Sequence, residues 1–237
     1  MNKYLLLLVG LLVYSSISTQ SVIGGWESYH KSPDGIDLRS VVIFADGYQA
    51  IASFDAKTGK FISCNGGTWK LVGDVMTEKV EFDSKKPERV GEEVTFKIEL
   101  SEDHLSIVGT DRKFDRMDDG TPGKLSGAWL MSGRIQDGEV QSRDTSGSRK
   151  TMKILSGTRF QWIAYNTETK QFNGTGGGNY TTIDGKYTEN IEFFSRDDSR
   201  VGASLVFDYK LVDGKWHHSG LSSKGDPIYE IWSIREK

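Results

Sequence analysis

Apolar and polar residues alternate along most of this chain, which is the period of a β-strand with one buried and one wet face. Between positions 94 and 100, for example, Val94, Phe96, Ile98 and Leu100 alternate with polar residues. After the first twenty residues no stretch keeps a helical period over ten or more positions. The runs are separated by turn signals ending in glycine: Asp34-Gly35, Asp46-Gly47, Thr58-Gly59, Asp119-Gly120, Asp137-Gly138, Ser156-Gly157, Asp184-Gly185 and Asp213-Gly214. The pattern predicts an all-β protein built as an antiparallel meander.

The sequence also repeats itself. A shift of 111 positions aligns Phe61 with Phe172, Phe96 with Phe207 and Gly109 with Gly220, without a gap from about Ile51 to Gly109. A copy of roughly 105 residues is long enough to bury its own core and too long for a solenoid repeat. We therefore predict two similar domains, at residues 21–124 and 125–237.

The second copy contains enough strand-like segments to close a sheet on itself. These segments are near residues 127–134, 151–155, 158–166, 171–175, 178–183, 186–195, 202–211, 214–221 and 228–234. Closure into an up-and-down barrel removes exposed strand edges and leaves an interior for side chains or one small ligand. The fold prediction is two tandem antiparallel up-and-down β-barrels, and an open two-sheet sandwich is the competing layout.

Residues 1–20 have the layout of a secretory signal peptide. An early cation, Lys3, precedes an apolar run from Leu5 to Val13 and small polar residues from Ser15 to Thr19. The run is too short to span a bilayer comfortably. Cleavage after Ser18 or Thr19 predicts an exported protein, periplasmic or secreted, with no stable membrane span, and an uncleaved membrane anchor is the alternative.

Composition narrows the class of protein. Cys64 is the only cysteine, so no intrachain disulfide can form, and its repeat counterpart Thr175 indicates a small buried side chain rather than a reactive thiol. A net charge of −3 with mixed signs argues against a nucleic-acid partner. The segment 137–149, rich in Ser, Gly, Asp and Arg, is predicted to be an irregular tip.

Two carboxylates fall on the apolar side of their strands. Glu78 shares its parity with Met76, Val80 and Phe82, and Glu189 shares its parity with Tyr187, Ile191 and Phe193. An unpaired buried charge is costly. We therefore expect each carboxylate either to form a structural hydrogen bond that caps the barrel interior or pairs with an inward Arg or Tyr, or to contact a ligand or act as an acid or base. A wrong assignment of the inward face is the remaining alternative.

The second copy carries polar or aromatic groups where the first has apolar ones, such as His218 for Ile107 and Tyr209 for Ile98. Aromatic walls with a few convergent polar groups are typical of small-molecule pockets. A barrel plugged by its own side chains is the alternative. The predicted ligand-binding residues are Arg159, Trp162, Tyr180, Glu189, Phe207, Tyr209, Trp216, His218 and Glu230.

No nucleophile elbow, phosphate loop or metal motif is present in the sequence. If the protein is an enzyme, Glu189, His218 and Glu230 are the acid–base candidates. His217 and His218 point to opposite faces of a strand and cannot share one metal ion, so neither a metal nor a cofactor is expected. The glycine run 174–178 lacks a following helix and is better explained by a bulge or a sharp barrel corner.

Several motifs resemble those of the lipocalin-like, or calycin, barrels. Each copy opens with a Gly-x-Trp arrangement, at Trp26 and Trp129, and the last strand carries Glu230-Ile231-Trp232 followed by Arg235. The second copy is more specifically similar to small secreted lipocalin-like proteins of Bacteroidetes whose biochemical role is uncharacterised. The resemblance implies a barrel, a possible pocket, and a basic residue of the final strand covering the first-strand tryptophan, but no reaction.

Together these features predict an exported, non-enzymatic protein that binds a small apolar or aromatic ligand in its C-terminal barrel, with the N-terminal barrel as a scaffold. A secreted hydrolase or isomerase acting on a carbohydrate or lipid fragment is one alternative. A surface interaction module with solid barrels is another, and no protein partner can be named.

Overall fold

A computed structural model of the chain describes residues 21–121, 123–222 and 224–236. The predicted signal peptide, residues 1–20, lies outside the described residues. The described ranges contain strands, turns and two short 3-10 helices but no α-helix. The predicted all-β class is confirmed.

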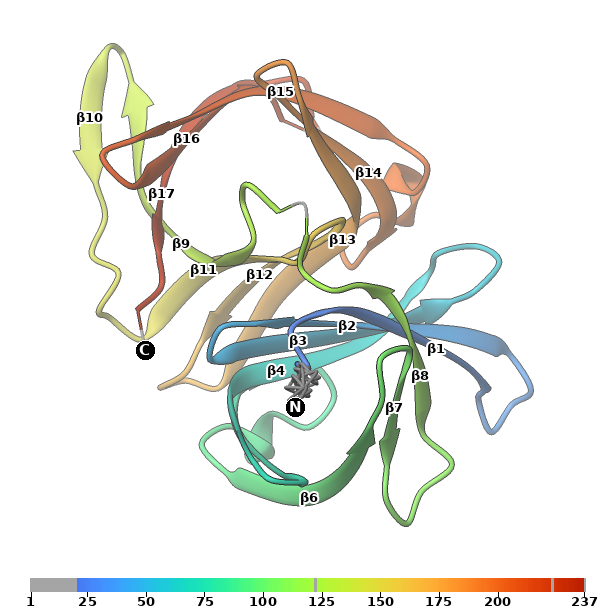
Figure 1. Cartoon of the computed structure of the whole chain (residues 1–237). Coiled ribbons are helices and arrows are strands. Elements are labelled where there is room, and N and C mark those ends of the chain that lie inside the picture. The colour runs from blue at the N-terminus through green and yellow to red at the C-terminus, as the bar shows by residue number, and fades with distance from the viewer. Residues whose placement is uncertain (1–20, 122, 223, 237) are drawn as a thin grey trace, which may run out of the picture.

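The N-terminal half forms a closed antiparallel barrel, barrel 1, whose strands are neighbours in chain order (Figure 1). Pairing of β1 with β8 closes the ring. The elements are β1 (Gly24–Lys31), β2 (Asp37–Ala45), β3 (Tyr48–Asp55), β4 (Phe61–Val72), β5 (Val75–Asp83), η1 (Pro87–Arg89), β6 (Glu93–Leu100), β7 (His104–Ile107) and β8 (Lys113–Asp118).

The C-terminal half forms a second closed ring, barrel 2, by pairing of β9 with β17. Strand β10 lies outside the ring as a hairpin with the far half of β9, so the predicted irregular tip at 137–149 contains a strand. The predicted segments 171–175 and 178–183 are one strand. The elements are β9 (Gly127–Gln136), β10 (Glu139–Ser142), β11 (Arg149–Leu155), β12 (Arg159–Asn166), β13 (Gln171–Ile183), β14 (Lys186–Phe194), η2 (Asp198–Arg200), β15 (Ser204–Val212), β16 (Lys215–Leu221) and β17 (Pro227–Ile234).

Each barrel has its own apolar interior. Trp26, Met76 and Leu105 lie in the interior cluster of barrel 1, and Trp129 and Trp216 lie in that of barrel 2. The two first-strand tryptophans are fixed alike: the indole N–H of Trp26 donates to the carbonyl of Val22 at 2.9 Å, and that of Trp129 donates to the carbonyl of Leu125 at 2.9 Å. Within each barrel, alternate residues supply a dry interior, as the period-two pattern predicts.

A β-bulge recurs at one position in both barrels. In β5 the register shifts so that Glu81 is the extra residue, and in β14 Glu192 is the extra residue. Glycine is required on the facing strand, because a Cβ at Gly178 would lie 1.9 Å from the carbonyl oxygen of Asn190. The bulge predicted for the glycine run is therefore present, between Gly177 and Gly178.

Strands β2–β4 of barrel 1 face β11–β13 of barrel 2 (Figure 1). A third apolar core joins the two barrels there. We call it the interface core. Phe193 stacks on Phe54 at 4.9 Å, and Phe82 packs on Tyr165 at 4.9 Å. The predicted inward orientation of Phe82 and Phe193 is wrong, because each follows a bulge that reverses the side on which the strand displays its residues. Cys64, 1% exposed, lies in the interface core, as expected of a buried thiol.

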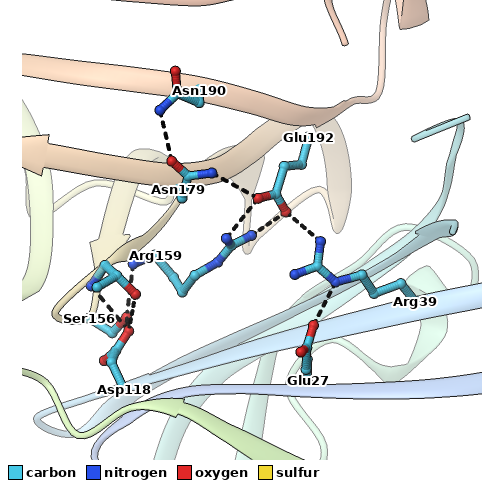
Figure 2. Close-up of polar contacts among 9 residues, drawn as sticks. Glu27, Arg39, Asp118, Ser156, Arg159, Asn179, Asn190 and Glu192 are labelled. Carbon is cyan, nitrogen blue, oxygen red and sulfur yellow. Dashed lines mark hydrogen bonds and ion pairs between the residues drawn. The ribbon is translucent and has the colours of Figure 1, made fainter. Parts of the chain in front are cut away.

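The end of β8 is fastened to barrel 2 by the carboxylate of Asp118. One oxygen accepts a hydrogen bond from the hydroxyl of Ser156 at 2.8 Å (Figure 2). The carboxylate also accepts from the hydroxyl of Thr158 at 2.6 Å and from the backbone amides of Gly157 at 2.9 Å and Thr158 at 3.1 Å. Burial alone would raise the pKa of Asp118, but these hydrogen bonds outweigh it and hold the pKa below its usual value. The connection between the barrels is therefore an ordered contact.

Candidate functional site

Barrel 2 contains a cavity of about 210 Å³ bounded by the inner faces of β11, β12 and β14–β17. Its wall is mainly aromatic and aliphatic, with a few charged groups. The lining residues are Thr151, Lys153, Trp162, Glu189, Ile191, Phe194, Leu205, Phe207, His218, Ser222, Ile228, Glu230 and Trp232. The barrel interior is therefore not completely filled by its own side chains.

A buried ion pair forms one side of this cavity. The ammonium of Lys153 on β11 lies 2.6 Å from a carboxylate oxygen of Glu189 on β14, and both side chains are 6% exposed. Removal of either partner would leave an uncompensated charge in a dry interior. The inward carboxylate of the second copy is thus balanced by a lysine.

Aromatic rings surround the Lys153 ammonium. Its nitrogen lies 5.1 Å from the ring centroid of Tyr187, 5.1 Å from that of Trp216, 5.3 Å from that of Trp232 and 5.9 Å from that of Phe207. Ring faces attract a cation most strongly where water is excluded. The lysine is therefore stabilised by one carboxylate and by four rings.

His218 and Glu230 form a second polar pair, between β16 and β17. Nδ1 of His218 lies 3.2 Å from a carboxylate oxygen of Glu230, and the indole N–H of Trp232 donates to the same oxygen at 3.2 Å. Burial alone would raise the pKa of Glu230, but the hydrogen bond from His218 and the charge of Lys153 hold it below its usual value. Glu230 is therefore an acceptor, and Nδ1 of His218 carries the proton.

The other ring nitrogen of His218 has no partner. Burial and the charge of Lys153 lower the pKa of His218, so the imidazole is neutral near pH 7. With the proton on Nδ1, Nε2 is a hydrogen-bond acceptor. This atom is buried and makes no hydrogen bond within the described part of the chain. An unsatisfied buried acceptor at a cavity wall is costly unless a ligand or water occupies it.

The structure brings five of the nine predicted binding residues to the cavity wall, namely Trp162, Glu189, Phe207, His218 and Glu230. Tyr180, Tyr209 and Trp216 belong to the interior cluster of barrel 2 without lining the cavity. The Tyr180 hydroxyl donates to the carbonyl of Ser156 at 2.7 Å, which gives it a structural role.

Arg159 lies outside the cavity, contrary to the prediction. It occupies the face of β12 turned toward barrel 1, where its guanidinium pairs with Glu192, one of the bonds being 2.7 Å long. Figure 2 shows the same carboxylate reaching Arg39 of barrel 1, at 2.8 Å. Arg39 in turn donates to Glu27 at 2.7 Å. The expectation failed because barrel 1 covers the outer face of β12. The pattern of polar and apolar residues along this strand therefore does not tell which side chains point into barrel 2.

A basic residue covers the first-strand tryptophan in barrel 1 rather than in barrel 2. The resemblance implied Arg235 over Trp129, but the Arg235 guanidinium forms two 2.8 Å bonds with Glu81 of barrel 1 and lies 4.2 Å from the ring centroid of Tyr48. Barrel 1 instead has Arg116 at 4.0 Å from the ring centroid of Trp26. The last segment of barrel 2 is therefore used to hold the two barrels together.

Sequence reasoning missed Lys153, Phe194 and Trp232 as cavity residues. The repeat held a signal for the lysine, because its counterpart Val42 stands on the inward parity of β2. A lysine is rarely fully buried without a partner, so the residue type alone predicts a position exposed to solvent.

Comparison with protein-family models and with curated proteins gave no match to this sequence. No helix in the described ranges is long and apolar enough to cross a membrane. Among the same residues, no three His, Cys, Asp or Glu side chains are grouped so that they could hold a metal ion. Function is therefore argued from the cavity itself.

Proposed function

We propose that barrel 2 binds a small aromatic molecule carrying one hydrogen-bond donor, such as a phenol or an indole. The observation that supports this most directly is the buried, unpartnered Nε2 of His218 at the wall of an aromatic cavity. A cavity of about 210 Å³ is smaller than the range of about 300–1,000 Å³ usual for drug-sized ligands, so the ligand is compact or inserts one end only.

The wall chemistry favours this ligand class over an anion. Lys153 and Glu189 neutralise each other, and the His218 imidazole is uncharged near pH 7, so among the described lining residues there is no free cation for an anionic ligand. The rings of Trp162, Phe207 and Trp232 can stack on a flat apolar body. An O–H or N–H of the ligand would donate to His218 Nε2.

The His218–Glu230 hydrogen bond favours a second candidate function, general-base catalysis. A carboxylate that orients an imidazole is the usual support of a catalytic histidine, and the Nε2 that would accept a ligand proton is the same atom. Ser222 and Thr151 also line the cavity. Turnover of an ester or glycoside by the purified protein would be needed to prefer this candidate over binding alone.

Calorimetric titration with phenol, using toluene as the isostere that lacks a donor, tests the binding proposal. We expect one phenol per chain and an affinity at least about tenfold above that of toluene, the ratio expected for one buried hydrogen bond. His218→Phe should remove this preference while keeping the ring volume. The surface histidine variant His217→Phe is the matched control and should bind as the parent does. Equal binding of phenol and toluene would overturn the proposal.

We also propose that the chain is exported and that its barrels are lipocalin-like. The layout of residues 1–20 supports export, and the chain-order antiparallel rings with a tryptophan on each first strand support the second point. Expression with and without residues 1–20 tests export, because only the full sequence should yield a shortened chain in the periplasm or medium. Amino-terminal sequencing of that chain should begin near Gln20.

A further inference from the structure

Barrel 1 contains its own cavity, of about 230 Å³, and six of its lining residues are repeat counterparts of residues that line the cavity of barrel 2. In the 111-position alignment, Glu78 corresponds to Glu189 and Phe96 to Phe207. The two cavities are thus copies of one site, with wall residues that have diverged. The lining of the barrel 1 cavity is Val42, Phe44, Gln49, Ile51, Asn65, Met76, Glu78, Arg89, Val94, Phe96, Ile98, Leu105, Ile107, Arg112 and Phe114.

The decisive difference concerns the partner of the inward carboxylate. In barrel 2, Lys153 supplies an ammonium to Glu189. The counterpart of Lys153 in barrel 1 is Val42, whose side chain carries no charge and no hydrogen-bonding group. No hydrogen bond or ion pair joins Glu78 to any residue in the described ranges. The barrel 1 cavity therefore keeps the carboxyl group of the buried pair but has no counterpart of the Lys153 ammonium among the described residues.

The groups around Glu78 match an ammonium with an apolar body. Ile98, Leu105, Ile107 and the other apolar lining residues give this cavity a mainly aliphatic and aromatic wall. Gln49, 3% exposed, also lines this cavity. Its carbonyl oxygen can accept a second N–H from an ammonium.

Two other charged side chains line this cavity, and both are cations. Arg89 on η1 is engaged by Asp83, with a nitrogen–oxygen distance of 2.8 Å, so most of its charge is already balanced. Arg112, in the turn before β8, is exposed to solvent, which screens it. His30 on β1, which lies near Arg112, has a lowered pKa owing to burial and to that arginine, and is neutral near pH 7.

We propose that barrel 1 binds a small primary amine with a short apolar or aromatic body, its ammonium held by the Glu78 carboxylate in the place that Lys153 occupies in barrel 2. This site is separate from the one proposed for barrel 2 and does not depend on it. Burial, only weakly opposed by Arg89, raises the pKa of Glu78 to about 7. Since the carboxylate must be ionised to hold an ammonium, amine binding should strengthen as the pH rises past about 7.

The test is calorimetric titration of the whole chain at about pH 8, above the pKa of Glu78, with 2-phenylethylamine as the probe. We expect one molecule bound per chain. The neutral isostere 2-phenylethanol and the anion 3-phenylpropionate should each bind at least about tenfold more weakly, because neither can form the charge-assisted bond. Tighter binding of the anion would assign the cavity to Arg89 and Arg112 and overturn the proposal.

Two variants locate the site within the chain. Glu78→Gln keeps the side-chain shape and should weaken amine binding at least about tenfold, whereas Glu93→Gln, an exposed change on β6, should leave it unaltered. Val42→Lys rebuilds the internal pair of barrel 2 and should abolish amine binding, with circular dichroism reporting retention of the fold. Unchanged amine affinity in either Glu78→Gln or a folded Val42→Lys chain would overturn the proposal. The phenol titration of barrel 2 is unaffected by these changes, so the two proposals fail independently.

Discussion

Phe61 and Phe172 occupy the same position in the two repeats, and their rings stack on each other with centroids 6.0 Å apart and planes 12° apart. A residue meets its own counterpart in this way at a twofold axis, where one surface patch pairs with a second copy of itself. The contacts off the axis come in matching pairs, because Phe54 with Phe193 and Tyr165 with Phe82 are the same two positions exchanged. The tandem chain therefore has the interface of a homodimer.

A shared core predicts that the two barrels lose stability together. Phe193→Ala, at the interface core, should lower the free energy of unfolding by about 3–5 kcal/mol, the usual cost of deleting a buried phenyl ring. Intrinsic tryptophan fluorescence and far-UV circular dichroism in urea should show one transition, moved to lower denaturant. Phe61→Ala, at a partly buried site, is the matched control and should cost less. Destabilisation confined to barrel 2 would contradict a shared core.

The Lys153–Glu189 pair predicts a large asymmetry between single and double substitutions. Lys153→Met leaves the Glu189 carboxylate buried alone and should lower the free energy of unfolding by about 3–5 kcal/mol near pH 7. Lys153→Met combined with Glu189→Leu removes both charges and should recover most of this loss. Urea denaturation of the parent, the two single variants and the double variant measures the coupling. Additive effects would show that the pair does not act as a unit.

Because the pKa of Glu78 is raised, we expect its contribution to the free energy of unfolding to fall as the pH rises. Most carboxylates in folded proteins contribute in the opposite direction. Because burial raises its pKa from 4.5 to about 7, the folded state binds the extra proton between these values, and stability present at low pH is lost as the pH rises through this window. The loss is on the order of 3 kcal/mol, at about 1.4 kcal/mol per unit of pKa. Glu78→Gln should remove this component, which denaturation at about pH 4 and pH 8 measures. Parallel curves for the parent and the variant would show an ordinary carboxyl group.

Asp118 predicts an acid-sensitive connection between the barrels. Its pKa lies below the usual 3.8, so it stabilises the folded state above that value and loses this effect as the pH falls through the lowered pKa. Asp118→Ala leaves donors of Ser156 and Thr158 unsatisfied and should cost about 2–4 kcal/mol at pH 7. The difference between parent and variant should shrink toward pH 2 in acid titrations followed by tryptophan fluorescence. Asp119→Ala, at the exposed neighbouring carboxylate, is the control.

The sequence predicted the barrels because the repeat and the period-two pattern agree over most strands. It predicted Glu189 and His218 inside correctly, since β14 keeps its alternation up to Ile191 and β16 keeps it throughout. The predicted orientation of Phe193 was wrong, because the bulge at Glu192 reverses the alternation of inward and outward side chains. Such a local bulge cannot be recognised from the periodicity of the sequence.

The outer faces of β11 and β12 were harder to interpret for a different reason. Met152 and Ile154 are apolar although they face outward, where barrel 1 covers them. Lys153, which lies between them, faces into barrel 2. The polarity of the side chains distinguishes the inner from the outer face of a strand only where the outer face is exposed to water. The chemistry of the cavity therefore depended on a lysine that pattern reasoning would place in solvent.

The twofold relation also bears on how this protein can evolve. In a homodimer of identical chains, each substitution alters both halves at once. Here Glu81 and Glu192 stand at matching bulges, yet the first holds Arg235 while the second holds Arg159 and Arg39. Because the two halves are separate stretches of one chain, each can change independently while the other still covers its apolar outer face.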